Sequence, residues 1–214
     1  MQLYLSATRL ALNSGQPRRW PPAIGQDPGA VRKSVEGMLD RLGTDYLDVA
    51  GLHSPHTNGW QVPDWESTIA EFDSLLAEGI IKGLSVSNFT VDHMTRAMEL
   101  TGLPIKTAQM AFSINYQKEV TISFREFCAA HCIQIAAYQP LQPDVLGSVA
   151  VQTIATAQNA TPAQVALAWT IQMGTLPVTK TISKDRIREN LAAPMVRLTD
   201  DEIEHLRSSA TTAY

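Results

Sequence analysis

The sequence predicts an α/β protein built on a parallel sheet, because two kinds of hydrophobic pattern alternate along the chain. Short apolar runs of strand length are separated by longer segments in which apolar residues recur every three or four positions. This alternation is typical of βαβ units. The chain has 214 residues, of which 44% are hydrophobic and 18% charged, so it can bury a core. We therefore expect residues 1–214 to form a single domain.

Six short runs predict strands: Leu3–Ala7, Leu47–Leu52, Gly83–Val86, Thr107–Ala111, Ile133–Tyr138 and Leu176–Val178. Periodicity alone does not tell whether these strands form an open sheet or a barrel. No G-x-G-x-x-G turn follows any of the runs, so the sequence gives no support to a Rossmann-type dinucleotide cradle.

Helical periodicity lies between the predicted strands, over Val31–Leu42, Trp65–Ala77, Val91–Leu100, Ile122–His131, Thr161–Met173 and Arg186–Leu191. Thr161 followed by Pro162 is a typical helix start, with an N-cap residue before a proline at the first helical position. Acidic residues at 200–202 predict the first turn of a final helix. Proline-containing segments at 14–29 and 54–63 predict loops.

Charge and composition argue against several classes of partner. The chain has 17 basic and 21 acidic residues, a formal charge of −4, and no long block of one sign, so we expect neither nucleic acid nor a membrane as partner. No apolar stretch has the length of a signal peptide or of a membrane span of about 20 residues, and there is no disulfide framework. These features predict a cytoplasmic protein.

The two cysteines, Cys128 and Cys132, are four residues apart in a predicted helix and would share one of its faces. Together with His131 they suggest a metal site, but three ligands so close in sequence rarely complete a tetrahedral shell. Structural thiols are the more common case. We therefore expect no metal.

Seven blocks of residues occur in one order along most of the chain: Arg41–Asp48, Leu52–Pro55, Gly79–Phe89, Ala108–Gln109, Ala137–Leu141, Thr161–Trp169, and Lys180–Thr181 together with Arg186–Asn190. In this order and spacing they resemble the aldo-keto reductase family. The resemblance implies a TIM-type (β/α) barrel, in which functional groups lie at the carboxyl ends of the strands. The expected fold is this barrel lacking its first two βα units, with about six parallel strands.

The resemblance implies NADP(H) as cofactor. His53 is similar to the family's active-site histidine, and Ser87, Asn88 and Gln109 resemble the residues that hold the nicotinamide carboxamide. Tyr138 looks like the ring on which the nicotinamide stacks. The adenosine 2′-phosphate and adenine would be held by residues of the last motifs, namely Lys180, Thr181, Arg186, Glu189 and Asn190.

Other interpretations of the same residues stay open. A histidine after a strand is often a hydrogen-bonded structural residue. Ser87 and Asn88 would serve equally as the N-cap of the following helix. Tyr138 would pack the rim of the sheet, Gln109 would satisfy backbone groups, and the basic residues of the last motifs would form a solvated helix face.

The sequence also departs from the family pattern. Full-length members begin with two further βα units, which carry an aspartate and the catalytic tyrosine, whereas here Met1 directly precedes the first predicted strand. Arg9 stands in the place of the family's lysine, so we expect His53 and Arg9 as catalytic residues. A positioned general acid contributes on the order of 10² to 10⁴ in rate, and His53, Tyr4 or a tyrosine of a second subunit would have to supply it.

Three functional hypotheses follow. The first is an NADPH-dependent oxidoreductase that acts on a small carbonyl compound with an incomplete catalytic tetrad. The others are a non-redox isomerase, lyase or cyclase on a repurposed barrel, and a catalytically inactive cofactor-binding subunit. Because missing strands leave open edges and apolar surface, we expect a homo-oligomer, preferably a dimer.

Overall fold

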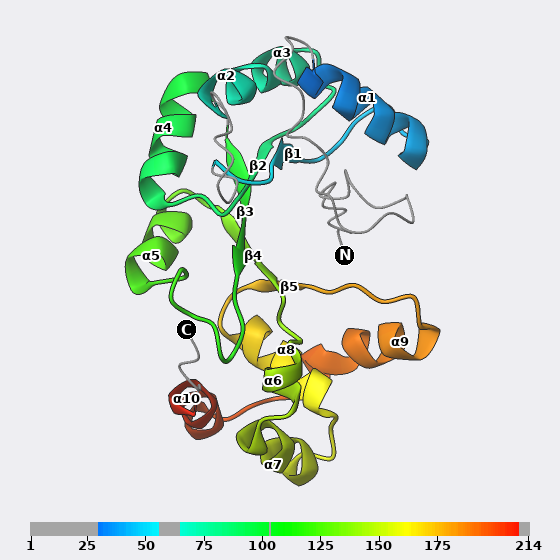
Figure 1. Cartoon of the computed structure of the whole chain (residues 1–214), viewed down its shortest axis with the longest axis vertical. Helices are drawn as coiled ribbons and strands as arrows, with labels where there is room; N and C mark the ends of the chain where they lie inside the picture. Colours follow the sequence, from blue (N-terminus) through cyan, green and yellow to red (C-terminus); the bar gives the residue numbers. More distant parts are fainter. Residues whose placement is uncertain (1–29, 56–64, 103, 210–214) are drawn as a thin grey trace. The chain divides into compact units, whose positions relative to one another are not determined.

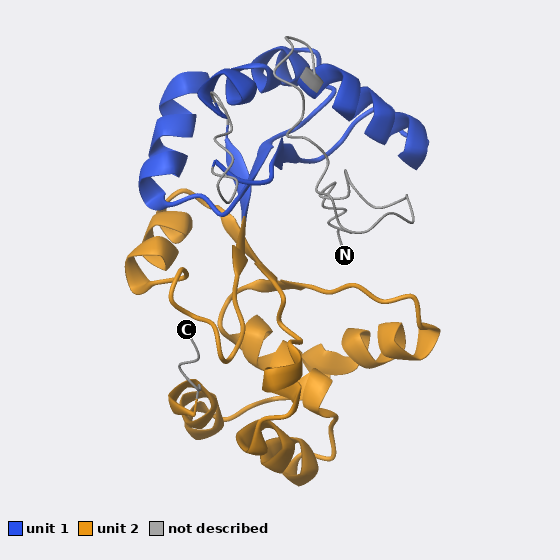
Figure 2. Ribbon diagram, viewed as in Figure 1, with its two compact units in different colours: residues 1–108 blue, residues 109–214 orange. Residues whose placement is uncertain are grey.

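The computed structural model describes residues 30–55, 65–102 and 104–209. The chain divides into two compact units, residues 1–108 and residues 109–214, which are coloured separately in Figure 2. Each unit is described here by itself, and the single domain expected from the sequence stays a prediction.

Unit 1 alternates helices and strands as the sequence predicts (Figure 1). Its elements are α1 (Ala30–Leu42), β1 (Ala50–Leu52), α2 (Trp65–Ala70), α3 (Phe72–Ala77), β2 (Leu84–Ser87), α4 (Val91–Thr101) and the first part of β3 (Ile105–Ala111). The predicted helix over 65–77 is divided at Glu71 into α2 and α3. The sequence predicts a strand that begins at Leu47, whereas β1 begins at Ala50. Leu47 itself forms only an isolated bridge with Ile81.

Unit 2 begins within β3 and carries more helix than the sequence predicts (Figure 1). It contains α5 (Ile122–Ala130), β4 (Gln134–Tyr138), α6 (Pro143–Leu146), α7 (Val149–Ala157), α8 (Pro162–Gln172), β5 (Leu176–Val178), α9 (Lys184–Ala192), the 3₁₀ helix η1 (Ala193–Met195) and α10 (Asp200–Ser208). Helices α6 and α7 are absent from the sequence prediction.

The strands follow one another in the sheet in chain order, β1-β2-β3-β4-β5. In unit 1, β1 and β2 are parallel, with Leu52 opposite Val86. In unit 2, β4 and β5 are parallel, with Tyr138 opposite Val178. Parallel neighbours joined by helices match the predicted fold class. The sixth predicted strand, Leu3–Ala7, lies outside the described residues.

Close approach of backbone explains the glycine in β1. A Cβ at Gly51 would collide with the backbone carbonyl of Ser85 on β2, its partner in the parallel register. Any side chain at position 51 would therefore push the two strands apart.

Helix α8 forms the centre of unit 2. All six residues from Val165 to Thr170 are buried, and the helix packs against α7, α9, β5 and η1. The ring of Trp169 stacks on that of Phe112, with 5.2 Å between ring centroids. Thr161 caps the helix as predicted: its hydroxyl accepts from the Gln164 N–H at 3.2 Å, and the Gln164 side chain accepts from the Thr161 N–H at 3.0 Å.

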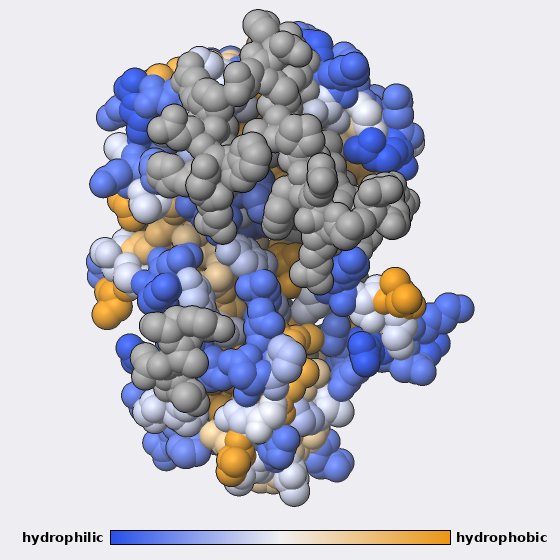
Figure 3. All heavy atoms as spheres, in the orientation of Figure 1, coloured by the Kyte–Doolittle hydropathy of each residue, from blue (hydrophilic) through white to orange (hydrophobic). Residues whose placement is uncertain are grey.

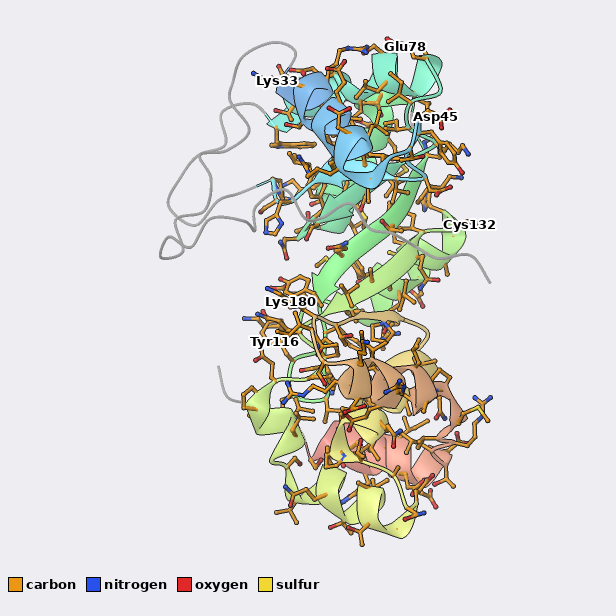
Figure 4. The ribbon with its side chains drawn as sticks, turned by 90° about the vertical axis from the view of Figure 1, so that its right-hand side faces the viewer. Lys33, Asp45, Glu78, Tyr116, Cys132 and Lys180 are labelled. Atoms are coloured by element: carbon orange, nitrogen blue, oxygen red, sulfur yellow. The ribbon has the colours of Figure 1, made fainter. Side chains whose placement is uncertain are left out.

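The expectation that the two cysteines share a helix face is wrong. Helix α5 ends at Ala130, and Cys132 adopts a left-handed backbone conformation with φ 55° beyond the helix. Cys128 is buried, whereas Cys132 is exposed at the outside of the molecule (Figure 4). Within residues 30–55, 65–102 and 104–209, no group of three or more His, Cys, Asp or Glu side chains is gathered as metal ligands would be.

Across the same described ranges, the structure contains no helix with the length and apolar character needed to cross a membrane.

Candidate functional site

The carboxyl ends of β1 and β2 bring together three predicted site residues in unit 1. Because Leu52 is opposite Val86 in a parallel pair, His53 and Ser87 leave the sheet side by side. Asn88 follows directly and links them. Its Nδ2 donates to the backbone carbonyl of His53 at 3.1 Å and to the Ser87 Oγ at 3.2 Å.

Asn88 has a left-handed backbone conformation with φ 59°, which few residues other than glycine and asparagine tolerate. The alternative that Ser87 or Asn88 caps the next helix is wrong, because Thr90 caps α4 and accepts from the His93 N–H at 3.3 Å. Phe89, between cap and strand, is buried in the core. Asn88 therefore orients the strand ends instead of starting the helix.

His53 keeps part of its ring exposed, and desolvation of the buried part lowers its pKa below the ordinary value of 6.5. The neutral form of the ring is therefore favoured at pH 7. A neutral imidazole has one N–H donor, which is suited to a carbonyl oxygen, and one acceptor.

In unit 2, Gln109 and Tyr138 lie on the neighbouring strands β3 and β4. Gln109 is buried, and Tyr138 is half-buried at the carboxyl end of β4, where its carbonyl accepts from the Phe112 N–H at 3.3 Å. Burial, and then the negative charge of Glu119, raise the pKa of the Tyr138 phenol. Tyr138 is therefore a neutral aromatic ring with part of its surface accessible, as a stacking platform requires.

The parallel register of β4 and β5 places Tyr138 beside Val178. The segment from Thr179 to Ser183 therefore begins next to the tyrosine and leads into α9. Asn190 on α9 donates from Nδ2 to the Thr179 Oγ1 at 3.3 Å, which ties the helix back to the strand end. Unit 2 thus brings the predicted ring and the predicted phosphate-binding residues to one end of its strands.

Lys180 on this segment and Arg186 on α9 carry charges that no ion pair within the described residues offsets. Both side chains are exposed. Arg188, by contrast, pairs with Asp185 at 2.9 Å. In Figure 4 Lys180 projects from the ribbon on the same side of unit 2 as Tyr116.

The N-terminus of α9 adds hydrogen-bond donors and the positive end of a helix dipole to these cations. Ser183 is its N-cap and accepts from the Arg186 N–H at 3.4 Å, and the Thr181 Oγ1 accepts from the Ser183 N–H at 3.1 Å. Glu189 is half-exposed, and its backbone carbonyl accepts from the Gln164 side chain at 3.3 Å. Cations, hydroxyls and a helix N-terminus fit a phosphate monoester such as the 2′-phosphate of NADP(H).

Two residues of this arrangement were missed by the sequence interpretation, and one predicted residue is not described. Thr179, which accepts from Asn190, and Ser183, which caps α9, were not singled out, although both lie within two residues of the predicted Lys180 and Thr181. Arg9 lies outside the described residues.

Comparison with known proteins identifies relatives of the whole described region. The profile of the Aldo/keto reductase family matches residues 18–149 and 147–211. An aldo-keto reductase of Mycolicibacterium smegmatis is 30% identical over 216 residues, covering 95% of this chain and 74% of the relative. A D-galacturonate reductase of Fragaria ananassa is 28% identical over 196 residues, and the chain spans only 60% of its length.

The structure is also similar to solved structures. That of an aldo/keto reductase from Klebsiella pneumoniae in complex with NADP and acetate has a TM-score of 0.73 and 26% identity. The match covers 86% of this chain and 65% of that one. This likeness confirms the fold class predicted from the sequence.

Proposed function

This chain belongs to the aldo/keto reductase family, and on that basis we propose that it binds NADP(H) and takes part in the reduction of a small carbonyl compound. The proposal rests mainly on the pairing of β4 with β5 in unit 2. Tyr138 lies opposite Val178, and the segment that follows Val178 contains Lys180 and leads into α9. The similar Klebsiella pneumoniae protein was solved with NADP bound.

The proposed cofactor contacts follow the chemistry of each side chain. Bound NADPH supplies a hydride. Tyr138 offers a neutral ring to the nicotinamide, and the amide and hydroxyl groups of Ser87, Asn88 and Gln109 match its carboxamide. Around the adenosine and its 2′-phosphate we propose the group named from the sequence, Lys180, Thr181, Arg186, Glu189 and Asn190.

We propose His53 as the residue that hydrogen bonds to the substrate carbonyl oxygen. Its lowered pKa favours a neutral ring whose N–H donates without a net charge. Arg9, the second catalytic candidate, keeps its charge at any physiological pH and is suited to an oxyanion or carboxylate. A hydrogen bond from His53 would polarise the substrate carbonyl, and the proton that completes the alcohol would come from solvent.

Fluorescence titration of NADPH and NADH against the chain and two arginine variants tests the cofactor assignment. Arg186→Ala should weaken NADPH binding by roughly tenfold or more, because it removes a charge-assisted contact worth about 1.5 kcal/mol, and should leave NADH nearly unchanged. Arg188→Ala is the matched control on the same helix, since its guanidinium already pairs with Asp185. Equal losses in both variants, or no NADPH binding at all, would remove the proposal.

Turnover is tested separately, by following NADPH absorbance with a panel of aldehydes and ketones. We expect consumption that falls in His53→Ala while NADPH affinity is retained. Conversion of substrate without nicotinamide would point instead to the non-redox alternative.

A further inference from the structure

The loop that follows β3 in unit 2, residues 112–121, is attached to the carboxyl end of β4. At its start the Phe112 N–H donates to the Tyr138 carbonyl at 3.3 Å. Further along, the Asn115 Nδ2 donates to the Asp144 Oδ2 on α6 at 2.7 Å. Because Tyr138 ends β4 and α6 follows it, these two bonds hold the loop on both sides of the strand end. The loop therefore lies beside the ring proposed for the nicotinamide.

Hydrogen bonds within the loop fix its shape. Ser113 and Tyr116 form a short antiparallel bridge with N–H to carbonyl distances of 2.9 and 3.1 Å. The Gln117 side chain donates to the Ile114 carbonyl at 2.7 Å. The Tyr116 hydroxyl donates to the Glu119 Oε1 at 2.9 Å. The Glu119 carboxylate is thus held in a defined position by a loop that is itself held beside β4.

The negative charge of Glu119 acts on both tyrosines of this region. Burial raises the pKa of the Tyr138 phenol, and the charge of Glu119 raises it further. For Tyr116, burial and then the hydrogen bond to Glu119 raise the pKa to about 12. A ligand ring stacked on Tyr138 would therefore lie in the field of the same carboxylate.

The oxidised and reduced forms of NADP(H) differ by a positive charge, which the oxidised nicotinamide ring carries. A negative group beside that ring stabilises the oxidised form more than the reduced form. We propose that Glu119 tunes the cofactor site electrostatically, by favouring the charged, oxidised nicotinamide on Tyr138 over the neutral, reduced ring. The inference rests on the proposed function, because it requires the nicotinamide to lie on Tyr138.

This preference favours one direction of the proposed reaction. Reduction of a carbonyl leaves the positive charge behind, since the hydride goes to the carbonyl carbon and a proton from solvent goes to its oxygen. Glu119 therefore favours reduction of the carbonyl over the reverse oxidation of the alcohol.

The expected effect is modest. Glu119 is exposed, and the neighbouring Lys118 carries the opposite charge, with its Nζ 5.3 Å from the centroid of the Tyr116 ring. Figure 3 shows mainly hydrophilic surface between the positions that β4 and α6 have in Figure 1. Because water screens charges that are exposed in this way, we expect Glu119 to change the relative affinity for the two forms by roughly threefold.

Isothermal titration calorimetry with NADP⁺ and with NADPH at low salt tests the inference. Glu119→Gln should raise the ratio of the NADP⁺ dissociation constant to the NADPH dissociation constant by roughly threefold, because the amide has no charge. Both forms carry the same phosphates, so the repulsion between these and Glu119 cancels in the ratio. Glu126→Gln, at an exposed position of α5 outside the loop, is the matched control and should leave the ratio unchanged.

Two further measurements separate the charge of Glu119 from the structure of the loop. Added salt should shrink the effect of Glu119→Gln, since salt screens interactions between exposed charges, whereas an effect of altered structure would persist. Tyr116→Phe removes the hydrogen bond to Glu119 and keeps the carboxylate. It should therefore change the ratio less than Glu119→Gln does.

The outcomes distinguish this inference from the proposed function. If neither form of the dinucleotide binds, the cofactor assignment is wrong and the inference falls with it. If both forms bind with the same ratio in the unmodified chain, Glu119→Gln and Glu126→Gln, the inference alone is overturned. An effect that salt does not reduce, or a larger effect of Tyr116→Phe, would overturn it as well.

Discussion

The two cysteines differ in solvent exposure, although their spacing in the sequence makes them look equivalent. Cys128 and Cys132 have the spacing of one helix face, yet one is buried and the other exposed. The spacing argument failed because α5 ends at Ala130, before Cys132. Cys132 then adopts a left-handed backbone conformation, which the sequence does not indicate because this conformation is expected mainly of glycine and asparagine.

The two thiols should therefore react at very different rates. Burial raises the pKa of the Cys128 thiol to about 11, so little thiolate is present at neutral pH. We expect iodoacetamide to label Cys132 alone in the native protein and both cysteines in urea, as followed by mass spectrometry of tryptic peptides. Equal native labelling would mean that α5 does not bury Cys128.

His53 should make stability depend on pH. Its folded-state pKa is lowered, so the unfolded chain takes up a proton first as the pH falls below about 6.5. The stability that the neutral ring contributes is complete above this value and is lost as the pH falls towards the lower folded-state pKa. Urea unfolding of the chain and of His53→Gln at several pH values should show a steeper acid-side loss in the unmodified chain. Parallel curves would contradict the desolvation of this ring.

Among the elements, strands, amphipathic helices and the helix with a clear cap signal were predictable, whereas α7 was not. The strand Leu176–Val178 and the start of α8 were predicted to the residue, because a short apolar run and a Thr-Pro cap are local signals. Helix α7 was missed because its buried residues, Ala150, Val151, Ile154 and Ala155, sit in a sequence rich in β-branched and small side chains. Its helical state comes from packing on α8.

The cap of α8 should contribute measurably to stability. Thr161→Ala removes an N-cap and half of a capping box, at a cost of about 1 kcal/mol in the free energy of unfolding. Chemical denaturation of this variant measures the loss. Thr153→Ala, an exposed position inside α7, should change the same free energy by less than about 0.5 kcal/mol. Similar effects for both variants would show that the cap adds nothing.

For the whole molecule, hydrophobic periodicity decides neither the type of sheet nor the register between its strands. Alternating strands and helices fit an open sheet and a barrel equally, and only the order of motifs such as Gly79–Phe89 and Arg186–Asn190 indicated the family's fold. The pairing of Tyr138 with Val178 likewise depends on register between strands far apart in sequence, which no local pattern encodes.

Cofactor binding should be visible in both units. If Ser87 and Asn88 act on the same ligand as Tyr138 and Arg186, NADPH should slow amide exchange at the end of β2 in unit 1 and at β4 and α9 in unit 2. Hydrogen–deuterium exchange with mass spectrometry measures this, with Arg186→Ala as the control. Protection confined to unit 2 would remove Ser87 and Asn88 from the proposed set.

Helix α9 is held from two sides before any ligand binds. Asn190 donates to Thr179 beside the end of β5, and the Gln164 side chain of α8 donates to the backbone carbonyl of Glu189. A phosphate group that binds at the start of this helix would therefore meet donors whose positions are already fixed, so that little conformational entropy of the backbone would be lost on binding.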